Sequence, residues 1–367
     1  MTATLVLEDG TTCAGESFGA RGATVGELVF CTGMTGYQET LTDPSYHRQI
    51  VLATAPHIGN TGWTAEDDES GRVWAAGYVV RDPARHPSSW RARSRLDDEL
   101  ARQGVVGVRG VDTRAITRRI RDRGSMRAGV FSGPVDVATA LATVRASAPM
   151  TGANLTGDVS PRRPAVLPAF GATRFRVAVL DLGCKRNLVR QLRRRGVEVH
   201  LLPGTAGPAE PLDRGVDGVL VSNGPGDPAS AGHLVEFVRG VLRAEVPLFG
   251  VCLGHQLLGQ ALGMSTYKMR YGHRGSNIPV VDTATGRVAI TAHNHGFAVA
   301  GAPDERFDTA FGAARVTHFC PNDATVEGVR CLDVPAFGVQ YHPEASAGPH
   351  DAESLFDEFT SLLGVRR

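Results

Sequence analysis

The feature that most constrains the fold is a cysteine set between two glycines, where a short apolar run meets a helical pattern. The run 248–251 ends at Cys252, Gly250 and Gly254 stand on either side, and apolar residues at helical spacing follow. This order predicts a buried strand, a sharp turn and a helix, the arrangement in which α/β enzymes present a nucleophile. The N-terminus of such a helix favours a thiolate. Taken alone, the pattern fits an inert buried cysteine equally well.

The second half of the chain repeats the same alternation of strand and helix. The predicted elements are strands at 177–183, 197–202 and 217–222, and helices at 187–195 and 230–244. Strands that alternate with helices predict a doubly wound, mainly parallel sheet. In such sheets the active site lies at the carboxyl ends of the strands. Both Cys252 and the loop at 223–228 are expected there.

The first part of the chain predicts a separate, mixed α/β domain. A strand is expected at 3–8, and Asp112 is placed to cap a helix at 113–123. The stretch 32–46 is rich in Gly, Thr, Asp and Pro, and predicts a long polar loop.

A linker is expected between the two halves. Residues 161–174 are rich in proline and lack periodicity. The expected boundaries are therefore an N-terminal domain at 1–160, a linker at 161–174 and a C-terminal domain at 175–367.

Charge and composition narrow the classes of partner and site. The chain has 367 residues and a formal net charge of +1, so no overall field attracts nucleic acid or an anionic membrane. The only lysines, Lys185 and Lys268, do not follow glycine, which excludes a Gly-Lys phosphate-binding loop. The six cysteines form no C-x-x-C pair, and no apolar stretch is long enough to cross a membrane. A reducing, cytoplasmic setting is expected.

A base for the cysteine is predicted near the C-terminus. His342 and Glu344 are separated by Pro343, which favours extended backbone before it, so both side chains project to one side. The carboxylate then holds one ring nitrogen of the histidine while the other faces Cys252. The alternative is an ordinary His-Pro-Glu turn at the surface.

An oxyanion site is predicted beside the cysteine. The loop at 223–228 contains Gly224 and Gly226, whose backbone N–H groups, with that of Leu253, are placed to bind a negatively charged oxygen. The alternative is a plain turn between strand and helix.

A metal site is not expected. His293 and His295 flank Asn294, just after a strand predicted at 288–291. No carboxylate or cysteine nearby in the sequence completes a ligand set.

Three motifs together resemble the class I, triad-type glutamine amidotransferases. They are the stretch 250–256 around Cys252, the loop 222–228, and His342-Pro343-Glu344. Further motifs resemble the small subunit of carbamoyl-phosphate synthetase over essentially the whole chain, and lie at 35–39, 42–46, 56–60, 185–187, 294–297 and 343–351. An N-terminal domain of this kind is peculiar to that family among the class I amidotransferases.

The resemblance implies glutamine hydrolysis. Cys252 attacks the side-chain amide, His342 acts as base and then acid, and Glu344 orients the histidine. The oxyanion donors implied are the amides of Gly224 and Leu253. The glutamine contacts implied are Ser45, Gly226, Gln256, Asn294, Gly296 and Phe297.

The resemblance also implies a partner. Ammonia passes to a large subunit that makes carbamoyl phosphate from bicarbonate for arginine and pyrimidine biosynthesis. ATP and magnesium are expected on that subunit, and no cofactor is expected in this chain. The implied assembly is a heterodimer, with a higher oligomer of that heterodimer also allowed.

This chain departs from the family pattern at two positions, and two other functions are possible alternatives. His293 stands where the family more often has glutamine, and Ile278 where it usually has histidine. An amidotransferase serving another acceptor, such as an anthranilate or guanylate synthetase, is disfavoured by the N-terminal domain. A catalytically silent regulatory or scaffold protein is disfavoured by the complete Cys-His-Glu set.

Overall fold

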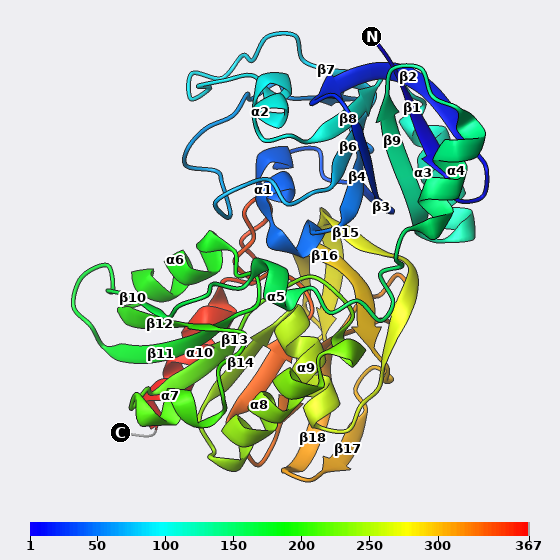
Figure 1. Ribbon diagram of the computed structural model, residues 1–367. Helices are drawn as coiled ribbons and strands as arrows, with labels where there is room; N and C mark the ends of the chain where they lie inside the picture. Colours follow the sequence, from blue (N-terminus) through cyan, green and yellow to red (C-terminus); the bar gives the residue numbers. More distant parts are fainter. Residues whose placement is uncertain (366–367) are drawn as a thin grey trace. The chain divides into compact units, whose positions relative to one another are not determined.

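The computed structural model describes residues 1–365 and divides the chain into two compact units. The first unit is Met1–Ala153 with Met269–Gly275. The second is Asn154–Lys268 with the described residues from Ser276 onward. The long strand β15 (Thr266–Asp282) therefore contributes residues to both units (Figure 1).

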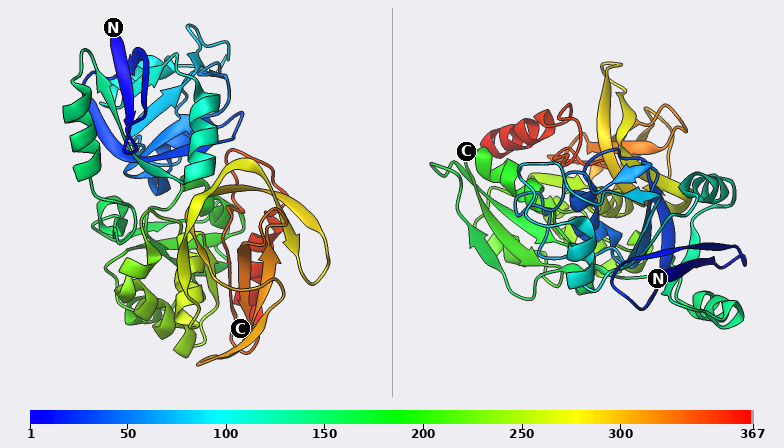
Figure 2. Two further views of the ribbon diagram at one scale, coloured as in Figure 1. Left: turned by 90° about the vertical axis from the view of Figure 1, so that its right-hand side faces the viewer. Right: turned by 90° about the horizontal axis from the view of Figure 1, so that it is seen from above.

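The first unit is built on a closed barrel. Among the described residues, its strands follow the order β1-β2-β8-β6-β4-β3-β9. These strands are β1 (Thr2–Leu7), β2 (Thr12–Gly19), β3 (Ala23–Cys31), β4 (Gln49–Ala53), β6 (Gly77–Val80), β8 (Val106–Arg109) and β9 (Met126–Ser132). A separate strand pair and four helices complete the unit: β5 (His57–Ile58), β7 (Asp82–Pro83), α1 (Tyr37–Thr42), α2 (Leu96–Arg102), α3 (Thr113–Arg123) and α4 (Val137–Ala146). Figure 2 shows the blue-to-cyan strands curving together with helices outside them.

In this unit, local sequence signals predict a strand and a helix cap correctly, and they miss one short helix. Strand β1 is confirmed, and so is the cap of α3, where the Asp112 carboxylate accepts from the Ala115 N–H at 2.9 Å. The polar-loop prediction for 32–46 is wrong in part, because this stretch contains α1 and a 3₁₀ turn at Pro44–Tyr46. Helix α1 is too short to show periodicity, and it is held by burying Tyr37 and Leu41.

The second unit is one large sheet. Its order is β10-β12-β11-β13-β14-β20-β19-β18-β15-β16, with β17 paired to β18. The strands are β10 (Ala165–Leu167), β11 (Phe175–Asp181), β12 (Val197–Pro203), β13 (Gly218–Val221), β14 (Leu248–Val251), β16 (Val288–Val299), β17 (Arg306–Thr309), β18 (Gly312–Phe319), β19 (Val326–Cys331) and β20 (Ala336–Val339). The run from β12 to β20 is parallel, and antiparallel strands extend it on both sides.

Helices cover both faces of the parallel strands, which confirms the doubly wound prediction. The helices of this unit are α5 (Thr156–Val159), α6 (Arg186–Arg194), α7 (Ala209–Asp213), α8 (Gly232–Arg243), α9 (Leu253–Ala261) and α10 (Ser354–Val365). One apolar core joins α8 and α9 to the sheet, and a second joins α6 and α10 to its other face. In Figure 1, α10 lies behind the strands and α8 and α9 lie in front.

The stretch 161–174 contains a piece of this sheet. Strand β10 pairs antiparallel with β12 at the edge of the sheet. An edge strand of three residues gives no periodicity, so the sequence offers no signal for it.

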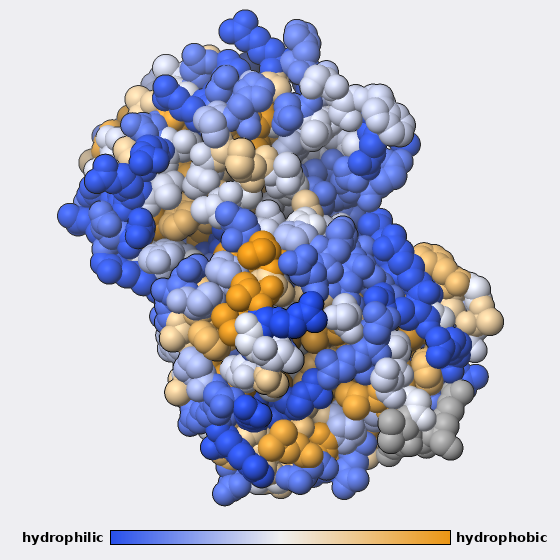
Figure 3. Space-filling view, turned by 180° about the vertical axis from the view of Figure 1, so that it is seen from behind, coloured by the Kyte–Doolittle hydropathy of each residue, from blue (hydrophilic) through white to orange (hydrophobic). Residues whose placement is uncertain are grey.

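The surface carries few large apolar groups. On the face drawn in Figure 3 most residues are hydrophilic, and apolar residues form small separate patches. Trp90 is the most exposed of the large apolar side chains in the described part of the chain, at 93%. No helix within residues 1–365 combines the length and the apolar character needed to cross a membrane.

Candidate active site

Cys252 lies at a strained turn between β14 and α9. Its backbone has φ 54° and ψ −102°, outside the regions that a side chain prefers. Strand β14 pairs in parallel with β20, and the Cys252 N–H donates to the Val339 carbonyl at 2.8 Å. The cysteine is thus the residue at which the strand ends and the helix begins. The predicted nucleophile elbow is present.

The two glycines of the elbow are required by close backbone contacts. A β-carbon on Gly254 would lie 2.1 Å from the Val221 carbonyl oxygen. A β-carbon on Gly250 would lie 2.6 Å from the Gly254 carbonyl oxygen. Both distances are too short for any side chain, so the turn closes only with glycine at these positions.

This packing gives a first testable prediction. Gly254→Ala is expected to lower the free energy of unfolding by about 1–3 kcal/mol, since overpacking shifts backbone that cannot move freely. Gly232→Ala is the matched control, because a β-carbon there meets nothing within 4 Å and Gly232 begins helix α8. Chemical denaturation should show loss for Gly254→Ala and no loss for Gly232→Ala. Equal stabilities would contradict this account of the elbow.

His342 and Glu344 form the pair predicted from their spacing. His342 Nδ1 lies 2.7 Å from Glu344 Oε1, and both side chains are buried, at 2% and 0% exposure. Because a carboxylate only accepts, His342 Nδ1 carries the hydrogen when the ring is neutral. The histidine follows the end of β20, the strand next to β14. The ends of two neighbouring parallel strands therefore supply base and nucleophile.

The charges of this pair are strongly coupled. Burial alone lowers the pKa of His342, but Glu344 and then the Cys252 side chain outweigh it and raise that pKa to about 10. Burial alone raises the pKa of Glu344, but Lys185 and His342 lower it to about 2. The site therefore holds an imidazolium and a carboxylate at neutral pH. A protonated His342 stabilises negative charge on the sulfur.

In this structure the Cys252 thiol donates to the Asn294 carbonyl oxygen, at 3.7 Å. Within the described residues, His342 Nε2 has no hydrogen-bond partner. Catalytic contacts often tighten only when substrate binds.

Lys185 lies in the motif at 185–187, but the sequence predicts no role for it in the site. Its ammonium lies 3.2 Å from Glu344 Oε1 and donates to the Ala345 carbonyl at 2.6 Å. Asn187 donates to the Glu344 carbonyl. These contacts hold the segment that carries the triad carboxylate. The signal was available, because Lys185 is one of only two lysines in an arginine-rich chain.

The predicted oxyanion donors are brought together. A β-carbon on Gly224 would lie 3.0 Å from Leu253 Cδ2, and the Gly254 N–H donates to the Ser222 carbonyl at 3.1 Å. Leu253 is the first residue of α9, so its N–H is one of the orphan donors at that helix terminus. Gly226, in the same loop, has φ 103°.

Two of the predicted glutamine contacts, Gln256 and Asn294, are hydrogen-bonded to Cys252, through its carbonyl and its thiol respectively. Gln256, in α9, donates to the Phe297 carbonyl at 2.8 Å, and the Asn294 carbonyl accepts from Cys252. Gly296 lies between Asn294 and Phe297 on β16. The strand expected at 288–291 in fact runs to Val299, so Asn294, Gly296 and Phe297 lie on it.

Ser45 belongs to the first unit. It lies buried in the 3₁₀ turn at Pro44–Tyr46, and its N–H donates to the Asp43 carboxylate at 2.9 Å. Its contact with glutamine stays a prediction.

Gln340 is a second residue that the sequence did not reveal. Its Nε2 donates to Cys252 Sγ at 3.6 Å, and its Oε1 accepts from Gln256 Nε2 at 2.9 Å. Together with Phe297, Gln340 uses both amide hydrogens of Gln256, so only the Oε1 of Gln256 remains for a substrate. Gln340 directly follows β20, where nothing in its local pattern separates it from core residues.

Comparisons with known proteins match both halves of the chain. Residues 5–130 match the family described as carbamoyl-phosphate synthase small chain, CPSase domain, and residues 178–362 match glutamine amidotransferase class-I. The carbamoyl phosphate synthase small chain of Streptomyces avermitilis is 58% identical, over all of this chain and 97% of its own length. That of Mycobacterium tuberculosis is 58% identical, over 98% of each chain.

These matches confirm the resemblance drawn from the motifs and the fold expected for the C-terminal half. With the elbow, the buried His-Glu pair and full-length relatives in agreement, the chain belongs to the carbamoyl-phosphate synthase small-chain family and carries a class I glutamine amidotransferase domain.

Proposed function

We propose that this chain is the glutaminase subunit of carbamoyl-phosphate synthase and delivers ammonia to a large subunit. The observation that carries the proposal is Cys252 at a strained elbow with the buried His342–Glu344 pair at the neighbouring strand end. This is the arrangement of an activated nucleophile, its base and the group that orients the base. Family membership narrows the substrate to glutamine.

The reaction has two halves. The Cys252 thiolate attacks the side-chain carbonyl carbon of glutamine, and the N–H groups of Gly224 and Leu253 stabilise the oxyanion. Protonated His342 gives its proton to the leaving nitrogen, and ammonia departs from a glutamyl thioester. His342 then takes a proton from water, which attacks the thioester and releases glutamate and the thiolate.

The glutamine contacts are assigned from the family resemblance. Gly226, Gln256, Asn294, Gly296 and Phe297 hold glutamine from the second unit, with Gln256 contributing its Oε1. Ser45 is assigned by the resemblance alone. The support is the family resemblance, together with the hydrogen bond from Cys252 to the Asn294 carbonyl and that from Gln256 to the Phe297 carbonyl.

The partner carries the remaining chemistry. The large subunit binds ATP and magnesium and makes carbamoyl phosphate from bicarbonate and the delivered ammonia, whereas glutamine hydrolysis in this chain uses no cofactor. The product serves arginine and pyrimidine biosynthesis. The assembly is a heterodimer in the cytoplasm. The six cysteines all lie within the described residues, and no disulfide joins them, as a reducing compartment favours.

The test is to combine the purified chain with the large chain from the same source. The mixture is expected to make carbamoyl phosphate from glutamine, bicarbonate and ATP, while the large chain alone needs ammonium. A silent scaffold would leave the mixture dependent on ammonium. Glutaminase activity that rises only with an anthranilate or guanylate synthetase partner would assign a different acceptor.

A further inference from the structure

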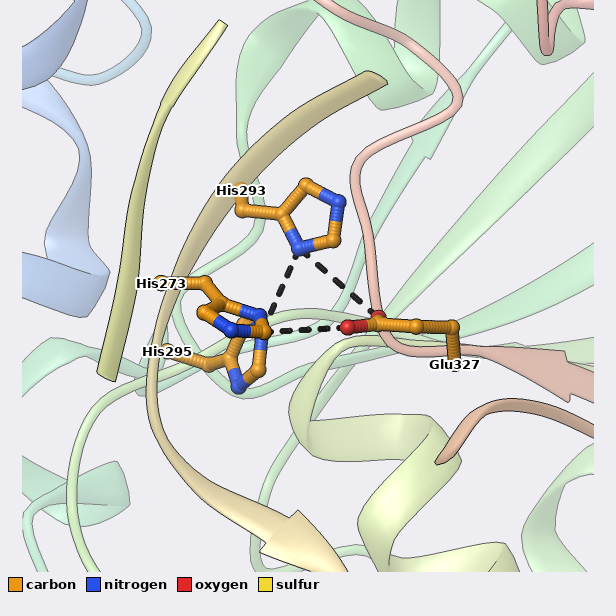
Figure 4. A group of neighbouring side chains, drawn as sticks. All are labelled: His273, His293, His295 and Glu327. Carbon is orange, nitrogen blue, oxygen red and sulfur yellow. Dashed lines mark hydrogen bonds and ion pairs between the residues drawn. The ribbon is translucent and has the colours of Figure 1, made fainter. Parts of the chain in front are cut away.

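Two histidines and a glutamate that the reaction does not use converge inside the second unit. His293 and His295 alternate on β16, so both project to one side of that strand, and Glu327 comes from β19. All three are buried, at 4%, 5% and 0% exposure. Figure 4 shows the two imidazole rings and the carboxylate turned toward one another. Histidine nitrogens and carboxylate oxygens are side-chain groups that bind transition metals in proteins.

The facing atoms are close together. His293 Nδ1 lies 3.3 Å from His295 Nε2. The carboxylate oxygens of Glu327 lie 3.7 Å from His293 Nδ1 and 3.9 Å from His295 Nε2.

The hydrogen bonds on the far sides of both rings determine which nitrogens carry hydrogen. The Thr291 hydroxyl donates its single proton to the Ile278 carbonyl at 2.9 Å, so its 2.7 Å contact with His293 Nε2 is donated by the ring. The Phe297 carbonyl only accepts, so His295 Nδ1 donates to it at 2.9 Å. In the neutral rings, His293 Nδ1 and His295 Nε2 therefore both present lone pairs to each other.

Two ring nitrogens and a carboxylate that lie this close together can bind one cation between them. A metal ion fits the geometry. Two nitrogens bound to tetrahedral zinc at about 2.0–2.1 Å are about 3.3 Å apart, which is the distance between these two rings. The carboxylate has to approach by roughly 0.4–0.6 Å to reach the same spacing. The outer hydrogen bonds from the rings to a hydroxyl and a carbonyl are those that usually orient metal-binding histidines.

We propose that His293 Nδ1, His295 Nε2 and the Glu327 carboxylate bind one divalent transition-metal ion, with zinc the best-matched metal. Two imidazoles and one carboxylate form a known zinc ligand set, and the fourth position is left to water. Figure 4 also draws His273, which belongs to the first unit; the proposed ligands are the three side chains of the second unit.

The ion would hold two strands of the sheet together and would take no part in the reaction. It ties β16 to β19 at the point where the Asn294 and Phe297 carbonyls accept from Cys252 and Gln256. The sequence does not predict this metal site, because Glu327 lies on another strand and no carboxylate lies near the two histidines in the sequence. The site also depends on His293, a position at which members of the family more often have glutamine.

The test uses the full chain, stripped with a chelator and then titrated with zinc or cobalt. Zinc is expected to bind at one equivalent per chain and to raise the unfolding temperature. Cobalt is expected to give visible absorption without the near-ultraviolet band of a cobalt–thiolate bond, which separates this site from the free cysteines. His293→Gln should weaken zinc binding by more than about 100-fold and abolish the cobalt spectrum.

His200→Gln is the matched control, because His200 also pairs with a glutamate in the same sheet, at 2.9 Å from Glu198. That variant should bind both metals as the wild type does. Glu327→Gln keeps both histidines, and it provides the comparison if His293→Gln does not fold. The proposal is overturned if the wild type binds no zinc at micromolar concentrations, which would leave a shared proton between the rings. Undiminished binding by His293→Gln or Glu327→Gln would overturn it as well.

Discussion

Cys252→Ala is expected to abolish glutamine-dependent carbamoyl phosphate synthesis while ammonia-dependent synthesis by the complex survives. The variant removes the only atom that forms the thioester, so the loss of turnover should be on the order of 10⁴–10⁶-fold. Alanine keeps a β-carbon, so the strained backbone at φ 54° is not made worse. The two activities are measured on the same purified complex.

Cys331→Ala is the control for this substitution. Cys331 is a buried thiol in the core that α8 and α9 share with the sheet, and it lies on β19. Its removal should leave the glutamine-dependent rate within about two-fold, since core effects act on stability first. Loss of both activities in Cys252→Ala would mean that the cysteine holds the complex together and does not act as the nucleophile.

Glu344→Gln is expected to lower glutamine turnover by about 10³–10⁴-fold with the fold retained. The amide keeps the shape of the carboxylate but no longer stabilises a protonated His342. It also removes the negative charge that lies 3.2 Å from the buried Lys185 ammonium. Glu236→Gln is the control, because Glu236 forms an exposed pair with Arg239 at 2.6 Å and should have little effect. Steady-state glutaminase assays at neutral pH measure both variants.

The same variant should change how stability depends on pH. The pKa of His342 is raised from 6.5 to about 10, so its contribution is complete below pH 6.5 and lost as pH rises toward 10. The pKa of Glu344 is lowered from 4.5 to about 2, so its contribution is present above pH 4.5 and lost as pH falls toward 2. The stability difference between wild type and Glu344→Gln should therefore be largest between pH 4.5 and 6.5. A difference independent of pH would contradict the coupling.

What the sequence could predict was local. The elbow follows from two glycines around Cys252 and an apolar run before them, and the His342–Glu344 pair follows from a two-residue spacing. Asp112 marks the start of α3 in the same way, because a cap is decided within one turn of helix. Such features need no knowledge of which strands become neighbours.

What the sequence could not predict depends on contacts between distant strands. Gln340 and Glu327 are separated from their partners by many residues, and only the order of strands in the sheet brings them together. The barrel of the first unit is hidden for the same reason, since closure depends on pairing β1 with β9. Lys185 is an intermediate case. It stands out in the sequence as one of two lysines, but its acidic partner Glu344 lies 159 positions away, so the pair could not be predicted.

The central claim is that glutamine passes through a thioester on Cys252. The other buried thiols provide the contrast, because burial raises the pKa of Cys320 and of Cys331 to about 12 and keeps both protonated. The direct measurement is mass spectrometry of peptides from the complex, quenched in acid during turnover with glutamine. One glutamyl group on the peptide that carries Cys252, and on no other cysteine peptide, is the predicted result. Steady glutamine hydrolysis with no adduct, or with the adduct on another cysteine, would contradict it.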